Sequence, residues 1–161
     1  MSENKTIPAR MLLNPAHFLS LGFGSGLSPF APGTFGTLAA IPVFIYLSKL
    51  EPEFYIAITV VLFVMGIGLC AYTTRVLGVH DHSGIVWDEI VGYLLTMVML
   101  PANIVTICLG FVLFRLFDIW KPWPICVLDR SIHGGLGIML DDVAAAIYAA
   151  ISLQLILPVI Y

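Results

Sequence analysis

Long apolar stretches separated by short polar segments dominate this chain. Phe54–Thr74 runs for 21 residues without a charged side chain, enough for one helical membrane crossing. Ile90–Phe114 is also uncharged, but the turn signal at Pro101–Asn103 divides it, so we expect two antiparallel helices there. The other apolar segments are Leu38–Leu50 and Asp142–Pro158. With a short N-terminal helix, the pattern predicts an all-α bundle of about five main helices.

The composition favours a membrane location for this bundle. Hydrophobic residues make up 60% and charged residues 11% of the 161 residues, and the mean hydropathy is +1.01. We expect a single domain over residues 1–161. Some helices are short for a full crossing, so tilting or partial insertion is expected. The alternative is a soluble all-helical protein with a large core.

The polar segments fall on one side of the predicted bundle. If the segment before Leu38 lies on side one, Glu51–Glu53 lies on side two. The chain then returns to side one at Arg75–Trp87, crosses to Pro101–Asn103, and returns again at Arg115–Asp141. Side one holds Lys5, Arg10, Arg75, Arg115, Lys121 and Arg130, whereas side two holds only Lys49. The excess of positive charge predicts that side one is cytoplasmic.

Most of the charge lies in three short segments, each at the end of an apolar run: His80–Glu89, Arg115–Lys121 and Asp129–Asp142. Ionisable residues are costly near a bilayer and often mark function there. The alternative is that they only mark the water interface, with Arg115 and Asp118 as a helical i,i+3 pair.

Two of these segments should meet at the open end of the predicted hairpin. Asp88 lies thirteen residues before Pro101, and Arg115 lies twelve residues after Asn103. At ~1.5 Å per residue both are roughly 20 Å from the turn, so they should face each other. We expect Asp141 at the N-cap of the last helix, on the same surface. Carboxylates suit Mg²⁺, and guanidinium or ammonium groups suit phosphate, so the pattern predicts a metal and phosphate site.

The segment Gly22–Thr37 is rich in glycine, proline and hydroxyl residues. Such a loop can present backbone N–H groups to an anion, and Thr34 or Thr37 would cap the helix that follows. It lacks the Gly-Lys-Ser/Thr of a P-loop. A structural turn is therefore an equal alternative to a phosphate cradle.

Histidines near the charged segments are candidate acids or bases. His80, Asp81 and His82 precede the helix that carries Asp88, and His133 precedes a glycine pair. Histidine titrates near neutral pH, which suits proton transfer. The alternative for each is a surface histidine without a chemical role.

In their order and spacing, four segments closely resemble the phosphatidylglycerophosphatase A family: GFGSGLSPFAPGTFGT, HDHSGIVWDE, FRLFDIWKPWPI and DRSIHGGLGIMLDD. The resemblance runs from about Asn14 to Ala150. It implies a Mg²⁺-dependent, multi-pass phosphatase of the bacterial inner membrane with its site facing the cytoplasm. Such an enzyme removes the terminal phosphate of phosphatidylglycerophosphate, giving phosphatidylglycerol and inorganic phosphate. The phospholipid substrate and the membrane are then its partners.

The resemblance and the residue chemistry together suggest a role for each candidate. The expected metal ligands are Asp88, Glu89, Asp141 and Asp142. The expected phosphate-binding residues are Arg115, Lys121, Arg130, Ser25, Thr34 and Thr37. The expected residues of proton transfer and catalysis are Asp88, Asp118, His80, Asp81 and His133. Asp118 would either complete the metal shell or orient Arg115.

Other function classes make different demands on the sequence. A small membrane transporter would carry ionisable groups near the middle of its helices, whereas here they lie at the ends. Another lipid phosphomonoesterase, such as one acting on phosphatidic acid, would need the same phosphate site. The net charge of −3, with seven Lys and Arg, argues against a nucleic-acid partner. The pattern leaves open the oligomeric state, the number of metal ions and the nucleophile.

Overall fold

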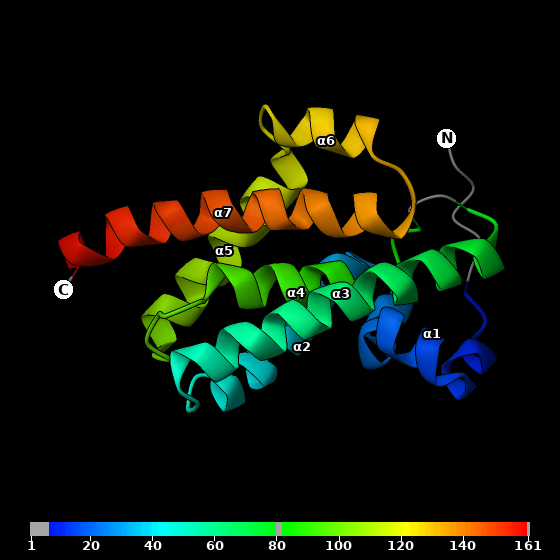
Figure 1. Cartoon of the computed structure of the whole chain (residues 1–161), viewed down its shortest axis with the longest axis horizontal. Helices are drawn as coiled ribbons and strands as arrows, with labels where there is room; N and C mark the ends of the chain where they lie inside the picture. The colour runs from blue at the N-terminus through cyan, green and yellow to red at the C-terminus, as the bar shows by residue number, and fades with distance from the viewer. Residues whose placement is uncertain (1–6, 80–81, 161) are drawn as a thin grey trace.

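The computed structural model of this protein describes residues 7–79 and 82–160, with the backbone alone at residues 128–130. All regular structure in that part is helical (Figure 1), which confirms the all-α prediction. The helices in chain order are η1 (Ala9–Leu13), α1 (Pro15–Ser20), η2 (Gly22–Leu27), α2 (Pro32–Leu47), α3 (Pro52–Leu77), α4 (Trp87–Thr96), α5 (Ile104–Trp120), α6 (Ile125–Ser131) and α7 (Gly134–Ile160).

The turn predicted at Pro101–Asn103 joins α4 to α5. The Asn103 side chain accepts a hydrogen bond from the backbone N–H of Thr106 at 2.9 Å, which caps α5. The short helix α6 was not expected, because the sequence analysis predicted no separate helix within Arg115–Asp141.

Two helix starts were predicted wrongly. α2 begins at Pro32 after Ala31, whose φ of 44° is left-handed, so Thr34 and Thr37 lie inside the helix and do not cap it. α7 begins at Gly134, so Asp141 lies well within the helix and is not its N-cap. In both cases glycine-rich sequence that favours a loop by propensity is helical, because tertiary packing overrides propensity.

Gly135 shows how that packing works. A methyl group there would overlap the carbonyl oxygen of Ile67 and lie 2.8 Å from the amide nitrogen of Ala71, both in α3. The start of α7 therefore approaches the backbone of α3 as closely as only glycine allows.

We expect Gly135→Ala to lower the free energy of unfolding by about 1–3 kcal/mol, because the new methyl group must displace backbone. Gly68→Ala is the matched control, since a Cβ at this exposed α3 position has open space around it. It should be neutral or slightly stabilising. Thermal unfolding of both variants in detergent measures the difference, and equal unfolding temperatures would contradict the close approach.

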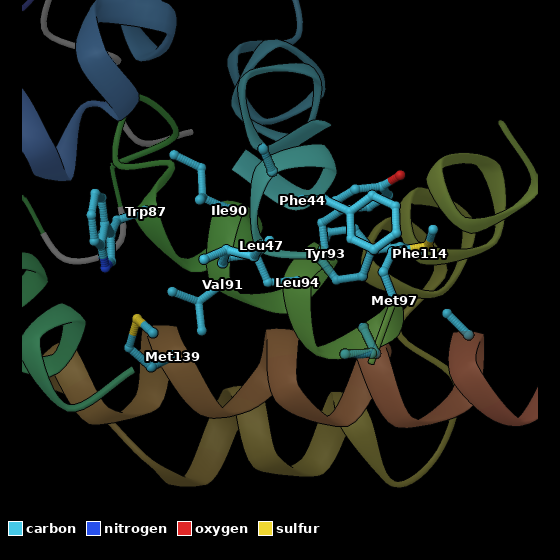
Figure 2. Packing of buried hydrophobic residues seen from close by; sticks show 14 of the residues in the cluster. Phe44, Leu47, Trp87, Ile90, Val91, Tyr93, Leu94, Met97, Phe114 and Met139 are labelled. Atoms are coloured by element: carbon cyan, nitrogen blue, oxygen red, sulfur yellow. The ribbon is translucent and has the colours of Figure 1, made fainter. Parts of the chain in front are cut away.

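The core is built around α4. This helix contacts α2, α3, α5 and α7, and Figure 2 shows Val91, Leu94 and Met97 on it among side chains of its neighbours. Two buried tyrosines tie the helices together. The Tyr93 hydroxyl donates to the carbonyl of Ile107 at 3.2 Å, and the Tyr55 hydroxyl donates to that of Leu94 at 2.7 Å. α4 is thus held from several sides.

Two helices are long and apolar enough to cross a bilayer. They are α3, with 26 residues, and α7, with 27 residues, and their most apolar windows have mean hydropathies of 2.5 and 2.2. In Figure 1 they run along the length of the molecule in opposite directions. On α7 the exposed Ile147, Ile151, Leu155 and Val159 recur every four residues. Such an apolar stripe on the outside of a helix suits contact with lipid.

Candidate active site

A pocket of about 320 Å³ lies where α2 and α4 begin and α5 ends, against the early turns of α7. The charged residues that line it are Asp88, Glu89, Arg115, Asp118, Lys121, Asp141 and Asp142. Its other lining residues are Ala31, Pro32, Gly33, Ser83, Ile85 and Ile119. We call it the carboxylate pocket. Seven of the residues predicted for one site therefore do lie around one pocket.

Three of the carboxylates form a tight cluster inside this pocket. Asp88 and Glu89 come from the first turn of α4, and Asp142 comes from α7. One oxygen from each lies within 4.8 Å of those of the other two. Asp88 and Asp142 are only 7% and 3% exposed. Buried acidic groups this close together are typical of a cation site.

Unpaired oxygens of the three clustered carboxylates also favour a bound cation. Within the described part of the chain, Asp88 Oδ1, Glu89 Oε2 and Asp142 Oδ2 are buried and have no hydrogen-bond partner. Buried polar atoms are almost always paired, so such atoms need an explanation. A hard divalent cation with oxygen ligands would satisfy all three at once.

Burial also changes the acidity of the two α4 carboxyls, which precede the apolar span that begins at Ile90. Burial raises the pKa of Asp88 well above its usual range, and the neighbouring charge of Glu89 adds to this. Burial raises the pKa of Glu89 to about 7. Burial therefore disfavours the charged carboxylates here, and a bound cation would offset that cost.

Arg115 lies beside the cluster near the end of α5. Its Nη1 atom pairs with Asp118 one turn later and lies 3.6 Å from Glu89 Oε1. The Arg115 side chain is 14% exposed, and its buried Nε has no partner among the described residues. Two carboxylates therefore position the guanidinium, which keeps donor capacity for a further group.

Gly33 allows the start of α2 to pack against this ion pair. A methyl group on Gly33 would lie 2.9 Å and 3.0 Å from the two Nη atoms of Arg115 and would overlap the carboxylate of Glu89. The glycine-rich segment thus reaches the pocket at Ala31–Gly33.

Lys121 and Asp141 form a second ion pair in the same pocket. α5 ends at Trp120, and Lys121 has a left-handed φ of 43°. Its Nζ lies 2.5 Å from Asp141 Oδ2. Asp141 pairs with this ammonium and is not part of the three-carboxylate cluster. Its predicted role as a metal ligand stays a prediction.

Comparison with known proteins identifies the family of this chain. The family model described as Phosphatidylglycerophosphatase A matches residues 18–157. The chain belongs to the phosphatidylglycerophosphatase A family. All the charged residues of the carboxylate pocket lie within the matched residues.

Individual relatives agree with this assignment. A phosphatidylglycerophosphatase A from Escherichia coli strain K12 is 48% identical over 138 residues, which cover 85% of this chain and 80% of the relative. A protein of the same name from Haemophilus influenzae is 48% identical over 153 residues, 94% of each chain. A Bacteroides thetaiotaomicron protein described as a candidate phosphatidylinositol-3-phosphatase is 38% identical over 140 residues, 83% of this chain and 87% of the relative. No solved structure matches.

Several residues predicted for the site of this phosphatidylglycerophosphatase A family member lie elsewhere. The Ser25 hydroxyl donates to the Gly22 carbonyl at 2.7 Å, and the buried Thr37 hydroxyl donates to the Gly33 carbonyl at 2.9 Å. Neither these residues nor Thr34 is among the described residues lining the carboxylate pocket. His133 is exposed and also lies outside that lining. The structure thus does not bring these four residues to the carboxylate pocket.

Three further predictions concern parts that the structure leaves undescribed. His80 and Asp81 lie outside the described residues, as does the side chain of Arg130. The neighbouring His82 is buried, and its Nδ1 accepts a hydrogen bond from the backbone N–H of Gly84 at 3.0 Å.

The sequence analysis missed several uncharged residues that line the carboxylate pocket. Ser83 and Ile85 lie inside the second family-like segment, so their place next to Asp88 was a usable signal. Ile119 follows Asp118 on α5, but nothing in its residue type marks it.

Proposed function

We propose that this protein hydrolyses the terminal phosphate of phosphatidylglycerophosphate, giving phosphatidylglycerol and inorganic phosphate. The observation that carries the proposal is the buried cluster of Asp88, Glu89 and Asp142, with unpaired oxygens, beside the positioned guanidinium of Arg115. A cation site next to an anion-binding side chain is what a phosphomonoester requires. The family membership supports the same substrate.

Mg²⁺ fits the donor set of the carboxylate pocket. Asp88, Glu89 and Asp142 would hold it, because their buried oxygens are hard anionic ligands without other partners. When bound, Mg²⁺ would supply Lewis-acid chemistry by neutralising charge on the phosphate.

The cationic side chains would bind and orient the phosphate. Arg115, held by Asp118 and Glu89, offers a planar fork of donors that matches phosphate oxygens. As negative charge shifts on these oxygens in the transition state, donors already in place stabilise it without reorganisation. Lys121, now paired with Asp141, adds a mobile point charge at the pocket.

Hydrolysis also requires proton transfer, because the attacking water loses a proton and the leaving glycerol oxygen gains one. Asp88 and Asp118 are the predicted catalytic carboxyls that line the pocket. Asp118 lies outside the three-carboxylate cluster, which leaves it the better placed of the two to take the proton from water.

The proposed setting is the bacterial inner membrane, with several crossings and the pocket at the cytoplasmic surface. The lengths of α3 and α7, the apolar stripe on α7 and the bias of Lys and Arg toward the pocket side support it. Trp120 and Trp123, beside Lys121, are 68% and 77% exposed. Tryptophan favours the boundary between water and lipid, where the head group of the substrate would lie.

A second candidate function is removal of a phosphate from another lipid head group. The 38% identical relative described as a candidate phosphatidylinositol-3-phosphatase is the observation that favours it. Such an enzyme would use the same carboxylate pocket and differ in what surrounds it.

The test is phosphate release by the purified protein in detergent, with Mg²⁺ and then with excess EDTA. Phosphatidylglycerophosphate is compared with phosphatidic acid, phosphatidylinositol 3-phosphate and a soluble phosphomonoester. We expect Mg²⁺-dependent release that is fastest from phosphatidylglycerophosphate and lost in EDTA. Faster release from phosphatidylinositol 3-phosphate would favour the second function, and release from no substrate by folded protein would contradict both.

A further inference from the structure

A second pocket adjoins the carboxylate pocket. Its volume is about 520 Å³, and it is formed by Ile7, by all residues from Gly26 to Pro32 except Phe30, and by His82–Gly84. Ala31, Pro32 and Ser83 line both pockets. The two pockets therefore share a wall, and we call the second one the linker pocket.

The chemistry of the linker pocket differs from that of its neighbour. None of the described residues that line it is Asp, Glu, Lys or Arg. Ser28 and Ser83 bring hydroxyl groups, and Gly26 and Gly84 pack so closely that a methyl group on Gly26 would overlap the Gly84 carbonyl oxygen. The wall is mixed, because His82 is also polar and the other side chains are apolar, namely Ile7, Leu27, Pro29, Ala31 and Pro32. A mixed wall without charged groups among the described residues suits the CH₂ and hydroxyl groups of a neutral polyol better than a second phosphate.

The linker pocket also borders an exposed apolar side chain. Phe30, between the lining residues Pro29 and Ala31, is 79% exposed. An exposed aromatic ring on a membrane protein suits the lipid boundary. Phe30 directly precedes Ala31, which lines both pockets, so a side chain suited to lipid contact lies close to the linker pocket and the carboxylate pocket.

We propose that the linker pocket binds the glycerol that joins the two phosphates of phosphatidylglycerophosphate. The inference rests on the proposed function, in which the terminal phosphate occupies the carboxylate pocket. Phosphatidic acid has no glycerol at that position, because its phosphate is attached directly to the diacylglycerol. Contacts in the linker pocket therefore favour one lipid over the other, and the metal and phosphate contacts do not.

Ser28→Leu tests this assignment, because Ser28 lines the linker pocket and not the carboxylate pocket. We expect kcat/KM for phosphatidylglycerophosphate to fall about tenfold or more as the leucine occupies the glycerol position. Two references report on the carboxylate pocket alone, namely turnover of phosphatidic acid and the inhibition constant of inorganic phosphate. Both should change by less than about twofold.

Ser48→Leu is the matched control. The Ser48 hydroxyl donates to the carbonyl of Ile45 at 3.0 Å, as the Ser28 hydroxyl donates to that of Phe30 at 2.8 Å. Ser48 lies after α2, among residues that line neither of the two pockets. The ratio of the two lipid activities should stay as in the wild type.

The outcomes separate this inference from the proposed function. An equal loss with both lipids, or no loss, in folded Ser28→Leu would overturn the linker pocket alone. If that variant does not fold, Ser28→Ala decides, because it removes one hydroxyl without adding bulk. Ser28→Ala should reduce the preference for phosphatidylglycerophosphate over phosphatidic acid about threefold. An unchanged preference would overturn the inference. Wild-type protein that releases phosphate from neither lipid would overturn the proposed function itself.

Discussion

Replacing Asp88 with asparagine is expected to lower kcat for phosphate release by at least about a hundredfold. Asparagine has nearly the same shape, but it removes one negative charge and turns an NH₂ group toward Glu89 and Asp142. The cluster would then bind a divalent cation weakly, and the charge on the phosphate would lack its counterion. Steady-state kinetics at saturating Mg²⁺ measure the loss.

The fold should not suffer from this change. Asp88 is 7% exposed and lies beside other carboxylates, so removing its charge relieves repulsion and the cost of burial. We therefore expect an unfolding temperature in EDTA equal to or above that of the wild type. Glu53→Gln, at an exposed position in the first turn of α3, is the control and should keep full activity. Near-normal turnover by folded Asp88→Asn would contradict the role of the cluster.

Replacing Arg115 with lysine is expected to lower kcat about a hundredfold, although the charge is kept. The guanidinium meets Asp118 and Glu89 with one Nη atom and still has donors for a phosphate. An ammonium group is a single point charge and cannot pair with these carboxylates while it presents a planar fork of donors to a phosphate. Because the effect belongs to the transition state, KM should change much less than kcat.

Arg75→Lys provides the matched control for that change. Arg75 is exposed in the last turn of α3, outside the carboxylate pocket. Its replacement should leave both kcat and KM as in the wild type. If Arg115→Lys instead raised KM and left kcat unchanged, Arg115 would serve only ground-state binding.

Hydrophobicity located the helices well. In a bilayer, an uncharged stretch such as Phe54–Thr74 can satisfy its backbone hydrogen bonds only as a helix. Hydrophobicity also located most of the charged pocket, because the charged residues of α4 and α5 lie near helix ends, whereas Asp141 and Asp142 lie within α7. In glycine-rich sequence, hydrophobicity did not predict where the helices begin. The start of α7 at Gly134 depends on contact with α3, which no local pattern reveals.

The partners of individual charges could not be predicted either. Asp141 and Asp142 are neighbours in sequence, yet one pairs with Lys121 and the other joins Asp88 and Glu89. Successive positions on a helix point about 100° apart, so the rotation of α7 about its axis decides which carboxylate faces which group. Tertiary packing sets that rotation.

Hydroxyl residues misled the sequence analysis for a related reason. Thr37 was a candidate phosphate ligand because it follows glycines, but inside α2 its hydroxyl bonds to the Gly33 carbonyl one turn earlier. Threonine in a helix commonly makes this bond. Ala31, Pro32 and Gly33 line the pocket in place of the predicted threonines.

The most direct test of the account is the binding of Mn²⁺, a spectroscopic substitute for Mg²⁺ with the same preference for oxygen ligands. Electron paramagnetic resonance of free Mn²⁺, titrated with purified protein in detergent, gives the affinity without any turnover. Asp88 in α4 and Asp142 in α7 belong to one cluster, so we predict that Asp88→Asn and Asp142→Asn each weaken the site by about tenfold or more, while Glu53→Gln leaves it intact. Wild-type affinity in both folded variants would contradict a shared cation site between these helices.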